Sequence, residues 1–327
     1  MTSVAIGAVD ELDPRLLEHR RELTGYCYRM LGSAFDADDA VQETLVRAWR
    51  GLAAFEGRSA LRSWLYRIAT NVCLDQLSSR QRRALPMDLS GSPWQPVEHS
   101  LAAQRPGTAW VEPILDRQVL SEDADPADRV VERESIRLAF VAALQHLPPR
   151  QRAVLLLRDV LRWKADEVAQ LLDTTTAAVN SALQRAHATL AERGGVPEPA
   201  ALDDGDHELL ARYLDAFERY DIDAFVGLLR DDATQHMPPF EMWLRGADDI
   251  VTWMLGPGAG CRGSRLLPVE ANGSPAFAQY RPRAEGGREP WALHVLELQG
   301  GRVAHISSFL EVGQGLFALM GLPESLE

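Results

Sequence analysis

Cysteine, lysine and long apolar runs are all scarce in this sequence of 327 residues. The three cysteines, Cys27, Cys73 and Cys261, lie far apart, which predicts reduced thiols and neither a disulfide framework nor a metal cluster. No apolar stretch is long enough to cross a bilayer, and the first residues lack the pattern of a secretory signal. Neither a glycine-rich phosphate loop nor a hydrolase nucleophile elbow occurs. We therefore expect a cytoplasmic protein with no metal and no cofactor.

The net charge of −13 is distributed unevenly along the chain. Residues 13–85 carry 12 basic and 9 acidic side chains, whereas residues 197–327 carry 10 and 21. Lys164 is the only lysine, so arginine supplies almost all of the positive charge. Contact with phosphates depends on the local field and not on the total charge. An acidic chain of this kind can therefore bind nucleic acid through its first two-thirds.

Periodicity divides the chain into two helical parts and a mixed part. Helical spacing of apolar residues covers residues 14–85 and 126–192, and strand-like alternation appears only within residues 206–327. Residues 86–125 are rich in Pro, Gly and Ser and predict a linker, and residues 193–205 predict a second one. The predicted fold class is multidomain, with an all-α first two-thirds followed by an α+β domain built on a curved antiparallel sheet.

The stretch "FEGRSALRSWLYRIATNVCLDQLSSRQRR", residues 55–83, combines arginines with Trp64 and Tyr66. Aromatic rings stack on exposed bases and guanidinium groups hold phosphates, so this composition suits single-stranded nucleic acid. The alternative is an ordinary amphipathic helix that buries its rings and exposes its arginines to solvent.

The stretch "KADEVAQLLDTTTAAVNSALQRAHATL" predicts two short helices with a turn between them. Asp173 can take the left-handed conformation of the turn, and Thr175 or Thr176 can cap the second helix. That helix could present polar side chains to the major groove of DNA, or the pair could serve packing alone. The candidate base-reading residues are Thr176, Asn180, Ser181, Gln184 and Arg185.

Taken together, "DADDAVQETLVRAW", "SWLYRIATNVCLDQL" and "LPPRQRAVLLLRDVLRWKADEVAQLLDTTTAAVNSALQRAHATL" resemble the extracytoplasmic-function (ECF) sigma factors of the sigma-70 family. The resemblance covers about residues 14–192. It implies that residues 14–85 are sigma region 2, which binds core RNA polymerase and melts the −10 element. It also implies that residues 126–192 are region 4, which reads the −35 element. The implied partners are promoter DNA and core polymerase, through the β′ clamp helices and the β flap.

The resemblance assigns roles to particular residues of region 2. The residues implied in core binding are Asp39, Gln42, Glu43, Arg47 and Trp49. Those implied at the −10 DNA are Arg58, Ser59, Arg62, Trp64, Arg67 and Asn71, and the arginines at the helix end, Arg80, Arg82 and Arg83, could hold the DNA backbone.

Residues from about 205 to 320 resemble a second family, the SnoaL-like group of the nuclear-transport-factor-2-like fold. "LLARYLDAFERYDIDAFVGLLRDDATQHMPP", "RGADDIVTWM" and "GGRVAHISSFLE" carry this resemblance. It implies a curved sheet and helices around a conical pocket, and a regulatory domain that acts on the sigma part in cis. The phrase "AWVEP", residues 109–113, resembles a Trp- and Pro-bearing element of such fused proteins, with a solvated linker as the alternative.

The pocket implied by this fold leaves the question of catalysis open. The candidate pocket residues are His236, Trp243, Trp253 and His294, with Asp215 or Asp248 as possible acid–base partners of the histidines. One alternative function is therefore a small-molecule isomerase or hydrolase that the helical part targets to DNA. Another is an ordinary repressor, which would leave residues 36–83 unexplained.

Overall fold

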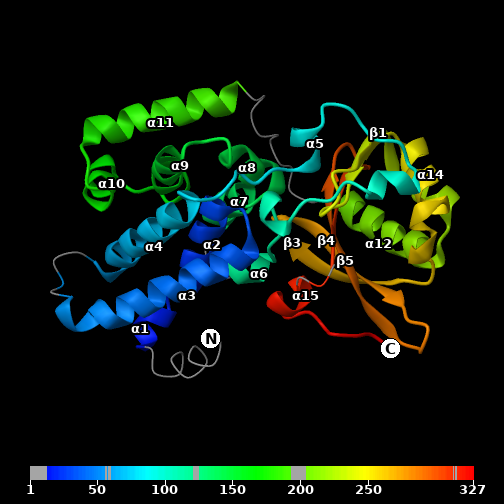
Figure 1. The fold of residues 1–327 in the computed structure, drawn as a ribbon, viewed down its shortest axis with the longest axis horizontal. Coiled ribbons are helices and arrows are strands. Elements are labelled where there is room, and N and C mark those ends of the chain that lie inside the picture. Colours follow the sequence, from blue (N-terminus) through cyan, green and yellow to red (C-terminus); the bar gives the residue numbers. More distant parts are fainter. Residues whose placement is uncertain are drawn as a thin grey trace. The chain divides into compact units, whose positions relative to one another are not determined.

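The computed structural model of the chain describes residues 13–55, 57, 60–120, 125–192, 204–311, 313 and 315–327. These residues form two compact units (Figure 1). The first unit combines the described residues up to Arg82 with those from Arg117 to residue 192. The second combines Arg83–Asp116 with the described residues from 204 onwards.

The first unit is entirely helical. Its amino-terminal part consists of α1 (Pro14–Leu17), α2 (Arg20–Leu31), α3 (Ala34–Gly51), the 3₁₀ turn η1 (Leu52–Ala54) and α4 (Leu61–Leu77). After α6 (Asp116–Val119), its second part consists of α7 (Pro126–Ser135), α8 (Leu138–Leu144), α9 (Pro149–Leu155), the π-helical turn η4 (Leu156–Val160), α10 (Ala165–Leu171) and α11 (Thr176–Ala191).

Local sequence determines where these helices begin and end. Gly32 takes a left-handed φ of 72° after α2, and the hydroxyl of Ser33 then accepts a hydrogen bond from the amide of Asp36 to cap α3. In the second part, the predicted turn is confirmed, because Asp173 has a φ of 49° and Thr175 caps α11 through the amide of Ala178. The helix-turn-helix is therefore made of α10 and α11.

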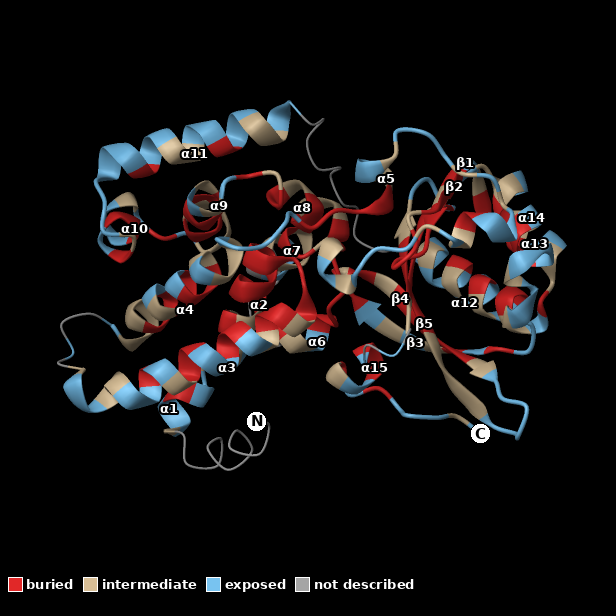
Figure 2. Cartoon of the chain, viewed as in Figure 1, coloured by how far each residue is buried: buried red, intermediate tan, exposed pale blue. Residues whose placement is uncertain are grey.

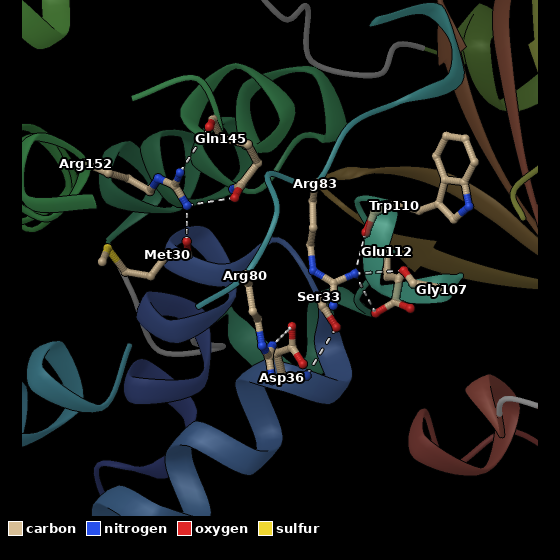
Figure 3. A network of polar contacts seen from close by, with 10 residues as sticks. All are labelled: Met30, Ser33, Asp36, Arg80, Arg83, Gly107, Trp110, Glu112, Gln145 and Arg152. Carbon is tan, nitrogen blue, oxygen red and sulfur yellow. Dashed lines mark hydrogen bonds and ion pairs between the residues drawn. The ribbon is translucent and has the colours of Figure 1, made fainter. Parts of the chain in front are cut away.

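Buried arginines hold the two helical parts of the first unit together. Arg152 of α9 donates to the carbonyl oxygen of Met30 in α2 and, at 2.7 Å, to Oε1 of Gln145 (Figure 3). Arg29 of α2 donates to the hydroxyl of Ser135 at 2.9 Å. Burial lowers the pKa of both guanidinium groups to about 10. Because a buried cation needs its partners, these bonds fix α2 against the second part of the unit.

The second unit is built on a six-stranded sheet in the order β2-β1-β6-β5-β4-β3. Its strands are β1 (Leu229–His236), β2 (Trp243–Arg245), β3 (Arg265–Ala271), β4 (Ser274–Pro282), β5 (Arg288–Leu298) and β6 (Val303–Leu310). Its helices are α5 (Pro86–Leu89), η2 (Glu98–Leu101), η3 (Gly107–Ala109), α12 (Asp204–Arg219), α13 (Ile222–Val226), α14 (Ala247–Leu255), η5 (Pro257–Cys261) and α15 (Leu316–Leu319).

The predicted fold class is confirmed, with one difference in the sheet. The pairing of β1 with β6 is parallel, so the sheet is mixed and not wholly antiparallel. Strand β1 lies near the start of the domain and β6 near its end. The two strands lie side by side and run in the same direction. Helices α12, α13 and α14 cover one face of the sheet, where Tyr213 stacks 5.4 Å from Phe277 of β4. This layer contains the core of the domain.

Candidate nucleic-acid interface

All five residues predicted to bind core polymerase lie on one exposed face of α3. Asp39, Gln42, Glu43, Arg47 and Trp49 are each exposed, and at about 100° per residue their positions fall within one side of the helix. The opposite side buries alanine and leucine residues in the core of the unit. Trp49 is 45% exposed, and Glu43 pairs with Arg47 at 2.7 Å. An exposed tryptophan within a charged stripe is a suitable docking feature for another protein.

Trp64 stands at the amino-terminal end of α4, half-buried against α3. Its ring stacks on Phe55 with 4.9 Å between the ring centroids. A Cβ at Gly51 would lie 3.1 Å from the ring of Trp64, so the ring packs closely against the end of α3. Asn71 is exposed two turns further along the same helix. Arg58 and Ser59 lie outside the described residues.

The remaining −10 residues on α4 already have partners in the helix-turn-helix part of the same unit. Nη2 of Arg67 donates to the carbonyl oxygen of Gln170 in α10 at 3.0 Å. Trp163 packs 5.2 Å from Tyr66, and the guanidinium carbon of Arg62 lies 5.6 Å from the centre of the Trp163 ring. In this arrangement region 4 contacts part of the predicted single-strand-binding face of α4, while Arg67 and Asn71 on that helix stay exposed.

The three arginines that follow α4 differ in their surroundings, and Figure 3 shows two of them, Arg80 and Arg83. Arg80 pairs with Asp36 at 2.5 Å, and Arg82 is exposed beside His146. Arg83, by contrast, is 5% exposed and donates to the carbonyl oxygens of Gly107 and Trp110. The prediction that Arg83 contacts DNA is therefore wrong for this structure, because its guanidinium is enclosed within the second unit.

The five candidate residues on α11 are all exposed along the outer side of the helix (Figure 2). Val179 and Ala186 are the buried positions of this helix and lie two turns apart. They fix α11 so that the polar side faces solvent. This exposed side consists of Thr176, Asn180, Ser181, Gln184 and Arg185.

Most of the predicted linker, residues 86–116, belongs to the second unit. At one edge of the sheet, the amide of Trp94 donates to the carbonyl oxygen of Trp243 in β2 at 2.8 Å. At the other edge, Ile114 and Asn272 exchange two hydrogen bonds, from each amide to an oxygen of the other residue. The segment Arg83–Asp116, here called the connector, thus pairs with both edges of the sheet.

The "AWVEP" element forms the most buried part of the connector. Trp110 and Val111 are 1% and 0% exposed, and Glu112 lies 3.7 Å from Nη1 of Arg83. The amide of Val111 donates to the carbonyl oxygen of Ala84, so the element closes the connector onto its own beginning. The solvated-linker alternative is therefore excluded.

A cavity lies in the second unit between α12, α14 and the sheet. Trp253 and His294 line it, as predicted, together with Tyr213, Phe217, Phe225, Gln235, Met237, Met254, Gly258, Cys261, Gln279, Trp291, Ile306, Ser308 and Leu310. Of these, the polar residues Gln235, Gln279 and Ser308 had not been predicted. Their signal in the sequence is slight, consisting of single polar residues within buried strands.

His294 is held through both ring nitrogens. Nδ1 lies 2.8 Å from the hydroxyl of Ser308, and Nε2 lies 2.8 Å from Oε1 of Gln279. Because an amide oxygen only accepts, Nε2 carries the proton and Nδ1 accepts from Ser308. Burial lowers the pKa of His294 to about 4, so the ring is neutral at pH 7.

The other two candidate pocket residues do not line the cavity. His236 pairs with Ser307 through Nε2 and packs 4.8 Å from the ring of His305, and neither histidine lines the cavity. Trp243 donates to the carbonyl oxygen of Ser90 and so holds the connector. Asp215, proposed as an acid–base partner, pairs with Arg219 on the exposed side of α12. Asp248 is also exposed and lines no part of the cavity.

Comparison with known families agrees with the two helical parts and the α+β domain. The family of sigma-70 region 2 matches residues 16–83, and that of sigma-70 region 4 matches residues 137–190. The SnoaL-like domain family matches residues 210–306. Together with the exposed faces of α3 and α11, these three domains define a transcription initiation factor of the sigma-70 class with a fused SnoaL-like domain.

Within that class, the chain belongs to the ECF sigma factors of RNA polymerase. It is 49% identical over 317 residues to the ECF RNA polymerase sigma factor SigG of Mycobacterium tuberculosis, covering 94% of this chain and 83% of the relative. It is 28% identical to SigJ of the same organism over 82% of this chain and 81% of the relative. As a member of this family it directs promoter-specific transcription initiation, and its partners are the polymerase core and promoter DNA.

The fold also has a solved counterpart. The crystal structure of the extracytoplasmic-function sigma factor SigJ of M. tuberculosis superposes with a TM-score of 0.59 at 22% identity, covering 95% of this chain and 99% of the other. Among the described helices, none combines the length and the apolar character that crossing a bilayer requires.

Proposed function

We propose that each exposed face of the first unit has a separate task in initiation. The stripe on α3 docks on the clamp helices of the polymerase β′ subunit, and α11 reads the −35 element while its domain contacts the β flap. Trp64, Asn71 and the uncovered guanidinium groups of α4 hold the opened −10 strand, acting in the cytoplasm with the polymerase. The observation that carries this proposal is the exposure of all ten predicted residues on α3 and α11.

The described arrangement of the first unit is a closed form that opens when the polymerase binds. Arg62 and Arg67 each give part of their guanidinium group to region 4, through Trp163 and Gln170, and these contacts compete with binding to DNA. The two regions are also held against each other through Tyr66 and Trp163, although the base-reading side of α11 is already exposed. Docking of α3 and of region 4 on separate parts of the polymerase supplies the free energy that separates them.

The C-terminal domain acts in cis by holding the connector. The connector joins region 2 to region 4, so whatever fixes it limits how far the two regions can move apart. Its pairing with Asn272 and Trp243, and the burial of Trp110, support this role.

The domain is a regulatory module that takes a small ligand in its cavity and is not an enzyme. The absence of carboxylates among the described lining residues and the full pairing of His294 support that assignment.

In vitro transcription with purified core polymerase tests the sigma assignment. The full chain should support promoter-specific initiation, and double substitution Trp64→Ala, Asn71→Ala should abolish strand opening while leaving closed-complex binding intact. Arg21→Ala, at an exposed position of α2, is the control. Failure of the full chain to initiate at any promoter recovered with the polymerase would overturn the proposal.

A separate variant tests regulation by the connector. Asn272 has a φ of 56°, so Asn272→Gly keeps the backbone conformation and removes the buried carboxamide whose oxygen accepts from the amide of Ile114. Release of the connector should raise initiation several-fold at a fixed core concentration. Glu285→Gly, in the exposed turn between β4 and β5, should not. Equal activity of both variants and the unchanged chain would contradict regulation through this contact.

A further inference from the structure

The cavity of the second unit has a buried floor and a half-buried mouth. Gln235, His294 and Ser308 are buried, whereas Cys261 and Trp291 at the mouth are partly exposed. The enclosed volume is about 50 Å³, and the hollow including its open mouth measures about 480 Å³. An enclosed space of about 150 Å³ is known to admit benzene. The floor therefore takes only a small head group, and the body of a ligand has to lie in the mouth.

One polar atom in this cavity lacks a partner. Gln235 is 8% exposed, and its Oε1 is buried without a hydrogen bond. The single proton of Ser308 is donated to Nδ1 of His294, so Ser308 can only accept from Nε2 of Gln235, 3.5 Å away. This chain of bonds directs the amide oxygen of Gln235 away from Ser308. A buried acceptor without a partner costs about 1–3 kcal/mol, and a donor brought by a ligand would recover that free energy.

The remaining lining carries no charge. Neither a carboxylate nor an arginine or lysine is among the described residues that line the cavity, and His294 is neutral there. A charged ligand would lose its hydration without gaining a partner of opposite charge. The walls are mostly rings and thioethers, with Tyr213 and Trp253 among the rings and Met237 and Met254 as adaptable side chains.

We infer that this cavity binds a small uncharged molecule with an apolar body and one hydroxyl or N–H group that donates to Oε1 of Gln235. The inference deepens the proposed ligand-binding role of the C-terminal domain and rests on it. It does not require the transcription role of the first unit, because binding is measured on the free chain.

Calorimetric titration of the full chain with four matched probes tests the inference. Phenol has a donor, toluene replaces the hydroxyl by a methyl group, anisole offers only an acceptor, and benzoate is charged. We expect phenol to bind most tightly and benzoate not to bind. Tighter binding of anisole or benzoate than of phenol would overturn the proposed uncharged, hydrogen-bond-donating ligand. If none of the four probes binds, the cavity does not bind a ligand with a single aromatic ring.

The variant Gln235→Leu removes the acceptor at nearly constant volume. The ratio of phenol affinity to toluene affinity should fall by about tenfold or more, which corresponds to the loss of one buried hydrogen bond. Folding should be retained, because the substitution removes a buried oxygen that has no partner and a nitrogen whose one hydrogen bond, to Ser308, is long at 3.5 Å. Gln299→Leu makes the same chemical change at an exposed position and should leave the ratio unchanged. An unchanged ratio in Gln235→Leu would overturn the inference even if transcription is normal.

Discussion

Arg67 in α4 and Gln170 in α10 are joined by a hydrogen bond of 3.0 Å between a guanidinium nitrogen and a backbone carbonyl. One partner belongs to the helix expected to open the −10 element and the other to the helix-turn-helix expected to read the −35 element. The bond therefore lies where the two promoter-binding regions meet, and it leaves the base-reading side of α11 exposed.

Trp163 supplies the apolar part of the contact between α4 and region 4. Removing its side chain should weaken that contact. Trp163→Ala leaves a cavity beside Tyr66, which should lower the free energy of unfolding by about 3 kcal/mol. Hydrogen exchange should speed up in α4, and the free chain should bind a single-stranded −10 oligonucleotide several-fold more tightly. Trp49→Ala, at an exposed site, provides the control for tryptophan loss. Unchanged exchange in α4 would mean that Trp163 does not hold the closed form.

Neighbouring arginines should respond oppositely to substitution. Arg83→Ala leaves the buried Glu112 and two carbonyl oxygens short of a partner, so we expect a loss of about 2–4 kcal/mol in the thermal unfolding of the second unit. Arg82→Ala, at an exposed position, should leave stability unchanged and weaken promoter opening. The reverse pattern, with Arg83 needed for DNA and dispensable for stability, would refute the assignment of Arg83 to the connector.

Trp49 should dominate the affinity for core polymerase. Truncating an exposed aromatic anchor at the centre of an interface commonly costs 2 kcal/mol or more, so Trp49→Ala should weaken core binding by about 30-fold. Stability should not change, because the side chain is 45% exposed in the free chain. Fluorescence-monitored titration with core polymerase measures this, with Arg21→Ala as the matched surface variant. If Trp49→Ala bound core polymerase as tightly as the unchanged chain, the polymerase would not dock on this face of α3.

Stability of the second unit should fall in acid. Burial lowers the pKa of His294 to about 4, and it also lowers the pKa of His236 and His305. Below about pH 6.5 the unfolded chain binds these protons and the folded chain does not, so the free energy of unfolding decreases as the pH falls. Protonation of His294 alone should lower the free energy of unfolding by about 3 kcal/mol between pH 6.5 and 4.

Denaturant unfolding at a series of pH values measures this loss. His294→Gln should flatten the acid limb of the curve, whereas His207→Gln, at an exposed position of α12, should leave it unchanged. A curve for the unchanged chain that stays level from pH 7 to 4.5 would show that these rings bind protons readily in the folded state.

Sequence patterns predicted those features that depend on local chemistry. The turn of the helix-turn-helix followed from Asp173 and Thr175, since a left-handed residue and a capping hydroxyl act within a few residues. The polar side of α11 followed from the helix-turn-helix pattern, whereas the stripe on α3 was implied by the resemblance to the sigma factors. Partners distant in the sequence could not be predicted in this way. Arg83 has the composition of a DNA-binding residue, and only its pairing with Glu112 and the carbonyls of Gly107 and Trp110 distinguishes it from Arg82.

The candidate pocket shows the same limit. His236 and His294 are equally plausible from sequence, but the strands place only His294 toward the cavity. The pairing of β1 with β6 is irregular between Leu229 and Thr234, so counting alternate residues along β1 does not give the face of His236. Likewise, the connector lacks any periodicity because its hydrogen bonds go to strand edges more than 100 residues away, as with Ile114 and Asn272.

The ordered connector also has a consequence for reach. Released from the sheet, the stretch from Arg83 to Asp116 could extend to roughly 110 Å, but while it is docked its ends are held by one folded domain. If the proposed regulation through the connector holds, docking to the SnoaL-like domain sets how far the two DNA-reading parts can separate. Promoters with different distances between the −10 and −35 elements should therefore require release of different lengths of the connector. The C-terminal domain would then contribute to the choice among promoters by spacer length.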